Sequence, residues 1–255
     1  MLFDVPHILY MAISLLVTVG LLIVAAKFAT KKEQKNAILK ITAAVTVILH
    51  YSSIWVEYFT NGGSTAGLEG SHLFPIYPCH IMMWVFFIAA FIKNKEGKAF
   101  TVLAEFCFWV GIVCTTIGIV LNENYANTPD FSDWSIFKSM VSHSTLLFGC
   151  LYMRVGGLMK IRVFNVVSAF IGLAAFIVDG LFINWLYDVC GLPEVNAMYL
   201  LHSPYPEVPW LSPIPLGLGV LLILFGALAL YEYLALPVEE RWYTKLKAYV
   251  KTKKA

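Results

Sequence analysis

The chain has 255 residues, of which 59% are hydrophobic and only 13% are charged, with a formal net charge of +2. A soluble globular domain is close to half apolar and about a quarter charged. This composition excludes an ordinary soluble domain and indicates an integral membrane protein. The sequence has no P-loop, no dinucleotide-binding fingerprint and no pair of cysteines with CxxC spacing.

Nearly uncharged runs of about 20 residues are long enough to cross the core of a bilayer. Each such run is expected to be a helix, because lipid offers the backbone no hydrogen-bond partners. The sequence predicts an all-α polytopic membrane protein, a single domain over residues 1–255 with seven transmembrane helices. The predicted segments cover about 7–29, 37–59, 73–92, 100–121, 136–153, 163–186 and 213–236.

The first segment is predicted to be an anchor rather than a cleaved signal peptide, because Asp4 is the only charge before Lys27. Seventeen of the 18 basic residues lie around the first, third and fifth connections and in the tail. Cytoplasmic loops are rich in Lys and Arg, so the N-terminus is expected outside and the C-terminus inside. A basic tail beside anionic lipid needs no nucleic-acid partner.

Ionisable side chains inside membrane segments are costly and usually functional. The candidates are His50, Glu57, Cys79, His80, Glu105, His143 and Asp179. With a rise of about 1.5 Å per helical residue, four of them are expected to lie roughly 9–13 Å below the outer boundary of the membrane. These four are His50, Cys79, His143 and Asp179. They predict one buried polar pocket that opens toward the outer leaflet. Glu105 alone falls near the cytoplasmic end.

Residues 74–83 read FPIYPCHIMM at the start of the third segment. Proline suits the first turn of a helix, so the regular helix is expected to begin at Pro78. Cys79 would then lie where the helix dipole favours a thiolate, beside free N–H groups that could hold an oxyanion. The stretch before it would be non-helical, which is typical of a membrane site. His80 points about 100° away, so His143 is the better base.

Simpler interpretations exist for each of these residues. Pro75 and Pro78 could shape a kink, and His50 and Asp179 could be polar tethers between helices. Cys79 could be a packing residue, as is expected of the four other cysteines, because a free cysteine behaves as a small hydrophobe. No disulfide framework is predicted.

Three stretches carry a resemblance to the YwaF-like family of bacterial integral membrane proteins. The resemblance is closer to the eukaryotic branch called transmembrane protein 164. Residues 77–81 (YPCHI) resemble its Asn-Pro-Cys-His-Val, and residues 142–152 resemble its histidine helix. Residues 194–210 are similar to its last outer loop. Order and spacing agree across residues 75–212.

The resemblance implies an acyltransferase that remodels phospholipids, with a phospholipid or lysophospholipid as substrate and with no cofactor or metal. It implies that Cys79 is the nucleophile that forms an acyl-thioester and that His143 is its general base and acid. The supporting residues expected in the pocket are His80, His50, Asp179, Asn196 and Tyr77. Two departures from the family pattern concern the substrate: Tyr77 replaces an asparagine, and His202 has no counterpart. The expected location is the cell membrane in a bacterium, or the endoplasmic reticulum or Golgi membrane in a eukaryote.

A pocket open to the outside has no supply of acyl-coenzyme A, so the expected acyl donor is a membrane lipid. Other functions stay open. Cys79, His50, His143 and Asp179 have the chemistry of zinc ligands and could serve a metal-dependent lipid hydrolase. A broken helix with buried ionisable residues also suits a transporter or a substrate-binding membrane protein. A purely structural partner in a complex would have an unreactive Cys79. No oligomeric state is predicted.

Overall fold

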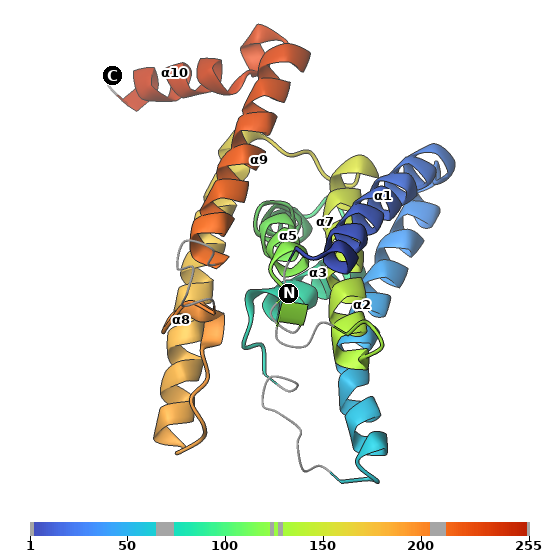
Figure 1. The fold of residues 1–255 in the computed structure, drawn as a ribbon. Helices are drawn as coiled ribbons and strands as arrows, with labels where there is room; N and C mark the ends of the chain where they lie inside the picture. Colours follow the sequence, from blue (N-terminus) through green and yellow to red (C-terminus); the bar gives the residue numbers. More distant parts are fainter. Residues whose placement is uncertain (1–2, 65–73, 123–124, 127–129, 205–212, 254–255) are drawn as a thin grey trace.

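The computed structural model describes residues 3–64, 74–122, 125–126, 130–204 and 213–253 (Figure 1). The described residues form helices and turns and no strand, which confirms the all-α prediction. The longer helices are α1 (Val5–Phe28), α2 (Lys32–Thr60), α3 (Pro78–Phe91), α7 (Trp134–Val155), α8 (Val167–Val189) and α9 (Pro213–Ala235). Between α3 and α7, the helices α4 (Lys98–Phe106) and α5 (Ile112–Val120) are joined by a π-helical turn, η2 (Cys107–Gly111).

The protein is an integral membrane protein with several apolar helices. Five helical stretches in the described residues are long and apolar enough to cross a membrane: Val5–Phe28, Lys32–Thr60, Lys98–Val120, Val163–Val189 and Ile214–Ala235. The short helix α3 is apolar but has only 14 residues. The helix α7 has 22 residues, but it carries Lys138, His143 and five Ser or Thr residues. The exposed residues of these two helices are Trp84, Ile88 and Phe91 in α3 and Phe137 and Val155 in α7, so the polar side chains of α7 do not lie on an exposed face.

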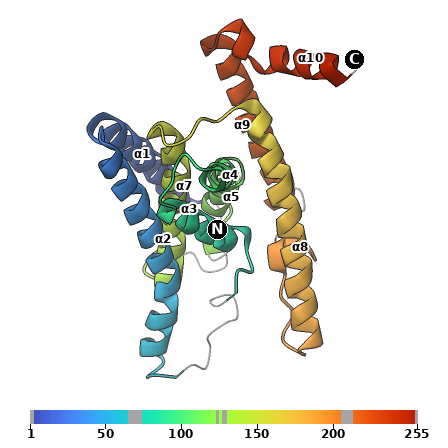
Figure 2. The ribbon, with the colours of Figure 1, turned by 180° about the vertical axis from the view of Figure 1, so that it is seen from behind.

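The helix α7 is central to the packing, because it contacts α1, α2, α3 and α5. The helix α8 contacts α4 and a short turn, η4 (Ala197–Tyr199), and α9 contacts α5. Figures 1 and 2 show α8 and α9 on one flank of the molecule and α1 and α2 on the other. The elements that carry Cys79 and His143, α3 and α7, therefore lie between two flanking groups of helices.

Aromatic rings packed onto glycines bring the central helices close together. The ring of Phe86 in α3 lies against Gly149 in α7, and the ring of Phe106 in α4 lies against Gly172 in α8. A Cβ atom at either glycine would overlap the ring. Small residues that let helices approach closely are characteristic of helix packing in membranes. In lipid no hydrophobic effect drives helices together, so their association depends on van der Waals contacts.

The start of α1 is fixed by buried polar contacts. His7 is fully buried; its Nδ1 accepts from the Phe3 N–H at 3.0 Å and its Nε2 donates to the Ile119 carbonyl at 3.1 Å. The Tyr125 hydroxyl donates to the Asp4 carboxylate at 2.8 Å. Burial and the neighbouring carboxylate raise the pKa of Tyr125 to about 12, so this hydroxyl stays protonated. These contacts tie α1 to the end of α5.

The C-terminal end of α3 is capped by a lysine that the sequence analysis counted as a loop charge. The Lys95 ammonium donates to the carbonyls of Ala89 at 2.7 Å and Ala90 at 2.8 Å. It also lies 4.6 Å from the centroid of the Phe100 ring. Burial lowers the pKa of Lys95 to about 8. A cation at this position satisfies carbonyls that have no partner inside the helix.

Helix boundaries differ from the predicted segments at charged or broken ends. The second segment was expected from residue 37, but α2 begins at Lys32. A helix can extend beyond the bilayer into water, so its end need not coincide with the end of the apolar run. The third was expected from residue 73, which lies outside the described residues, and α3 begins at Pro78. A further helix, α10 (Trp242–Lys253), was not predicted, because its polar sequence gives no membrane signal. It turns away from the direction of α9 (Figures 1 and 2).

Replacing Gly172 with alanine is expected to lower the free energy of unfolding by about 1–3 kcal/mol, because the added methyl group forces the Phe106 ring to move. The measurement is the melting temperature of the detergent-solubilised protein. Gly226→Ala in α9 is the matched control, since nothing lies within 4 Å of its Cβ position. Alanine favours a helix over glycine by about 1 kcal/mol, so the control should melt at the same temperature or slightly higher. Equal melting temperatures for both variants would show that the Phe106 contact does not matter.

Candidate active site

A cavity of about 810 Å³ lies among α2, α3, α5, α7, α8 and α9. Five of the predicted site residues line it: His50, Tyr77, Cys79, His80 and His143. The structure therefore brings the predicted nucleophile and the predicted base into one space. Two other predicted residues, Asp179 and Asn196, do not line this cavity.

Cys79 lies in the first turn of α3, where the sequence placed it. Tyr77 is the extended residue before the helix, with φ −107° and ψ 153°, and Pro78 occupies the first helical position. The N–H of His80 donates to the Tyr77 carbonyl at 2.9 Å. That bond corrects the expectation that this N–H is free to hold an oxyanion. The backbone donors that face the Cys79 sulfur are its own N–H and that of His80.

The tautomer of His143 follows from one hydrogen bond. Its Nδ1 lies 2.6 Å from the carbonyl oxygen of Ser139, one turn earlier in α7. Because a carbonyl only accepts, Nδ1 carries the proton and Nε2 keeps a free lone pair. The Cδ2–Nε2 edge of the ring lies against Gly118 in α5, where a Cβ atom would overlap it. His143 is thus held in the form that can accept a proton at Nε2.

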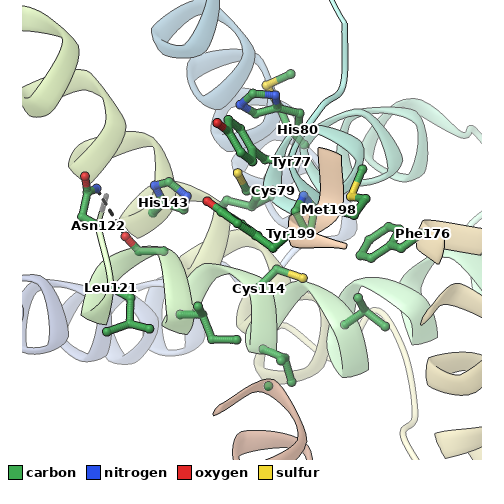
Figure 3. A pocket seen from close by; sticks show the side chains of 18 of the residues that line it. Tyr77, Cys79, His80, Cys114, Leu121, Asn122, His143, Phe176, Met198 and Tyr199 are labelled. Atoms are coloured by element: carbon green, nitrogen blue, oxygen red, sulfur yellow. Dashed lines mark hydrogen bonds between the residues drawn. The ribbon is translucent and has the colours of Figure 1, made fainter. Parts of the chain in front are cut away.

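Figure 3 shows Cys79, His143 and Tyr199 facing the same space. Within the part of the chain that the structure describes, no hydrogen bond joins Cys79 to His143. Hydrogen bonds between catalytic groups often form only when substrate is bound, so geometry without a ligand does not rule out such a pair. Cys79 is also within electrostatic range of Lys138 and Cys114.

Aromatic and imidazole rings form the wall of the cavity beside Cys79. The rings of His50 and His80 meet edge to face, with centroids 4.3 Å apart. Tyr77 contacts His80 at 5.3 Å and stacks on Tyr199 at 5.2 Å. These contacts fix the rings of His80 and Tyr77 next to the thiol. They place both residues at the reacting end of the cavity.

The turn η4 closes the cavity with a strained backbone. Met198 and Tyr199 have φ values of 55° and 56°, in the left-handed region that residues other than glycine seldom adopt. The Met198 N–H donates to the Ile76 carbonyl at 2.9 Å, and the Ala197 N–H donates to Asn184 Oδ1 at 2.8 Å. Such strain persists where surrounding contacts over-determine it, and it clusters at functional sites. Sequence reasoning missed Tyr199, because no local pattern signals this conformation.

Asn196 lies just before η4, binds the residues that follow this turn, and does not line the cavity itself. Its Oδ1 accepts from the Leu201 N–H at 3.0 Å, and its Nδ2 donates to the His202 carbonyl at 2.7 Å. The His202 ring lies 3.5 Å from the Glu194 carboxylate. Asn196 therefore acts on the position of Tyr199 through the backbone. Residues 205–212 of this predicted loop lie outside the described residues.

Two membrane carboxylates fall outside the cavity. Asp179 lies in α8 with Oδ2 buried and without a hydrogen-bond partner. Its predicted depth matched that of Cys79, but depth along an axis does not fix the direction in which a helix turns the side chain. Glu105 accepts from Asn165 at 2.7 Å and from Ser168 at 2.9 Å, and so ties α4 to the start of α8.

Sequence reasoning also missed Lys138, the one basic residue outside the clustered loops and tail. It is 8% exposed and lines the cavity from α7. A helical periodicity of polar residues could have found it, because one face of α7 carries the cavity-lining residues Ser135, Lys138, Ser139, Ser142 and His143. It lies within electrostatic range of Glu57 across the cavity.

The opposite wall of the cavity is apolar. Residues of α8 and α9 supply it: Ala169, Leu173, Phe176, Ile177, Ile214, Leu218 and Leu221. The cavity is therefore amphipathic, with thiol, imidazole and ammonium groups on one side and hydrocarbon on the other. Among the described residues, no three His, Cys, Asp or Glu side chains gather to hold a metal ion. The hypothesis of a zinc site in this cavity gains no support from that arrangement.

Comparison with known proteins identifies a family for the chain. No curated protein and no solved structure matches the chain. A family model described as the TMEM164 family matches residues 2–233, which include α1 to α8 and most of α9. This match confirms the resemblance to transmembrane protein 164 that the motifs around Cys79, His143 and Asn196 indicated. The chain belongs to the TMEM164 family.

Proposed function

We propose that the protein is an acyltransferase that moves a fatty acyl chain between membrane phospholipids through a thioester on Cys79. The observation that carries the proposal is the amphipathic cavity that joins Cys79, His143 and an apolar wall. A thiol and an imidazole divide acyl transfer into two easier steps. The apolar wall offers a place for the acyl chain while its ester reaches the thiol.

In the first step, the Cys79 thiol gives its proton to Nε2 of His143 and the sulfur attacks the ester carbon of a donor phospholipid. The ester C–O bond breaks, and His143 returns the proton to the departing oxygen, which leaves as the hydroxyl of a lysophospholipid. In the second step, the hydroxyl of an acceptor lysophospholipid loses its proton to His143 and attacks the thioester. The C–S bond breaks and Cys79 recovers its proton. No oxidant or cofactor enters this balance.

We assign the oxyanion that forms in each step to the backbone N–H of Cys79, because N–H groups in the first turn of α3 have no acceptor inside the helix. A preorganised donor of this kind is worth several kcal/mol in a site that excludes water. The proton on Nδ1 of His143, held by the Ser139 carbonyl, keeps Nε2 available as the base. The position of Gly118 allows the imidazole to occupy this place.

Seven membrane-spanning helices with the N-terminus outside belong to the same proposal. Figure 1 supports it, since the α1–α2 turn, the α7–α8 connection and the C-terminus lie toward one end of the molecule. The last turns of α2 and α8 lie toward the other end. The basic residues of the α1–α2 turn, the α7–α8 connection and the C-terminal tail lie toward the first end, which supports a cytoplasmic location for it. Cys79, at the start of α3, then faces the outer leaflet, and a membrane lipid is the acyl donor.

The orientation is testable with fusions expressed in a bacterium. Green fluorescent protein attached after residue 255 should fluoresce, because it folds in the cytoplasm, and alkaline phosphatase at that position should be inactive. Alkaline phosphatase inserted after Leu192, beyond the end of α8, should be active, because it folds outside. The reverse pattern would place the cavity on the cytoplasmic side and restore acyl-coenzyme A as a possible donor.

The nucleophile is testable by intact-mass spectrometry of purified protein after incubation with mixed phospholipids. Wild type should carry a fatty-acyl mass that hydroxylamine removes, and Cys79→Ala should carry none. His143→Ala should load about 10²–10⁴ times more slowly, which is the usual contribution of a general base.

The matched control is Cys190→Ser, since Cys190 is exposed and lies outside the cavity. This variant should load like wild type. A labile adduct that persists in Cys79→Ala would assign the nucleophile elsewhere. If neither wild type nor any variant carries an adduct, the thioester mechanism is wrong, and transport or lipid binding is favoured instead.

Gly118→Ala tests the position of His143 without removing any reacting group. The added methyl group would overlap the Cδ2–Nε2 edge of the imidazole, so the ring must turn away from its place. A displacement of about 1 Å can cost on the order of 100-fold in rate. We expect the rate of thioester formation, measured well below the melting temperature, to fall on that scale, while the same overlap lowers the melting temperature as it does in Gly172→Ala. The control is Gly20→Ala, where nothing lies within 4 Å. An unchanged loading rate in Gly118→Ala would show that the imidazole does not need this position.

A further inference from the structure

We propose that Lys138 is the anchor for the phosphate group of a glycerophospholipid in the cavity. This inference rests on the proposed function for its biological meaning, but it concerns binding and not the thioester chemistry. It assigns a substrate-binding role to a residue that neither the motifs around Cys79 and His143 nor the family match identifies.

Lys138 is a buried cation without a partner. Its side chain is 8% exposed, and it projects from α7 into the wall of the cavity. Within the described residues, its ammonium makes no hydrogen bond and no ion pair with a carboxylate. An ammonium group taken out of water carries a penalty that only a close counter-charge offsets. An anion bound in the cavity would supply that counter-charge.

The groups around Lys138 leave room for a bound anion. Glu57 and Cys79 are within electrostatic range of the ammonium. His80 and His143 are also within electrostatic range, and their positive forms would repel it. Glu57 lies close enough to stabilise the ammonium but forms no ion pair with it. The ammonium therefore stays available to a ligand.

The position of Lys138 along α7 suits a lipid whose ester is at Cys79. Lys138 precedes His143 by five residues, or about 7.5 Å along the helix axis. It lies near the start of α7, beside Ser135 and Ser139, which also line the cavity. In a glycerophospholipid, only the glycerol backbone separates the phosphate from the ester carbonyl groups. A phosphate on Lys138 and an ester at Cys79 can therefore belong to one molecule.

The rest of the cavity distinguishes a phospholipid from a soluble phosphate. The walls from α8 and α9 are hydrocarbon, with Leu173, Phe176 and Leu218 among the lining residues. A small phosphate ester would leave that surface in contact with water, whereas an acyl chain would cover it. A charge-assisted hydrogen bond at one end and apolar burial at the other together select an amphiphile.

The test measures binding to delipidated protein in detergent, with Cys79→Ala as the background so that no acyl transfer occurs. The probes are phosphatidylglycerol and diacylglycerol that carry the same fluorescent acyl chain, with glycerol 3-phosphate as a competitor. Lys138→Met should raise the Kd for phosphatidylglycerol by about tenfold to a hundredfold, the size of one charge-assisted bond. The Kd for diacylglycerol should change by less than about twofold, and Lys138→Arg should restore phosphatidylglycerol binding.

Stability separates a ligand anchor from a structural residue. Because Met removes an unpaired buried charge, Lys138→Met should raise the melting temperature of the ligand-free protein. A lower melting temperature together with equal loss of both lipids would mean that Lys138 is structural, and would overturn the inference. Equal affinity of Lys138→Met and its parent for phosphatidylglycerol would also overturn it.

Three further outcomes separate the hypotheses. If glycerol 3-phosphate binds as tightly as the lipid and depends equally on Lys138, the ligand is a soluble phosphate and the lipid assignment is wrong. If Lys138-dependent lipid binding holds but wild type forms no thioester, the acyltransferase proposal fails and the phosphate anchor stands. If the thioester forms from phosphatidylglycerol at the same rate with Lys138→Met, the anchor fails and the acyltransferase stands.

Discussion

The need of every backbone amide in a membrane for a hydrogen-bond partner governs this structure. Residues 74–77, just before α3 begins at Pro78, are not helical, and they lie beside the candidate site. The carbonyl of Ile76 there accepts from the N–H of Met198, which lies on the strained turn η4. A carbonyl in one non-helical segment is thus paired with an N–H group in another. The same contact that repairs the backbone brings Tyr199 against Tyr77 and closes the cavity.

That arrangement explains why the site is made from distant parts of the chain. The proposed nucleophile comes from the start of α3 and the proposed base from the middle of α7. The cover comes from the loop after α8, and the hydrocarbon wall comes from α8 and α9. Close approach of these elements depends on positions without side chains. Gly149 accommodates the ring of Phe86 and Gly118 accommodates the ring of His143. Close helix packing and the position of the imidazole therefore both depend on glycine.

The cavity has a polar wall and an apolar wall, as suits an amphiphile with a polar and an apolar part. Helix α7 presents serines, a lysine and a histidine to it, and this polar face keeps α7 from qualifying as a membrane span by composition. Surrounded by α1, α2, α3 and α5, α7 does not have to face lipid on that side. A helix that is too polar for lipid is therefore informative, because its polar face must serve a cavity or a neighbouring helix.

The sequence by itself determined the membrane class, the order of the apolar helices and the start of α3. Apolar run length and the fixed φ of proline act locally, so they are readable without a structure. It also selected Cys79 and His143, and the family match covers both. It did not place Asp179, because equal depth in a bilayer leaves the rotation of a helix open. The place of Tyr199 and the surroundings of Lys138 became visible only in the tertiary structure. The strained backbone of η4 is maintained by the hydrogen bonds from Met198 to Ile76 and from Ala197 to Asn184. The missing partner of Lys138 is a property of the groups around it.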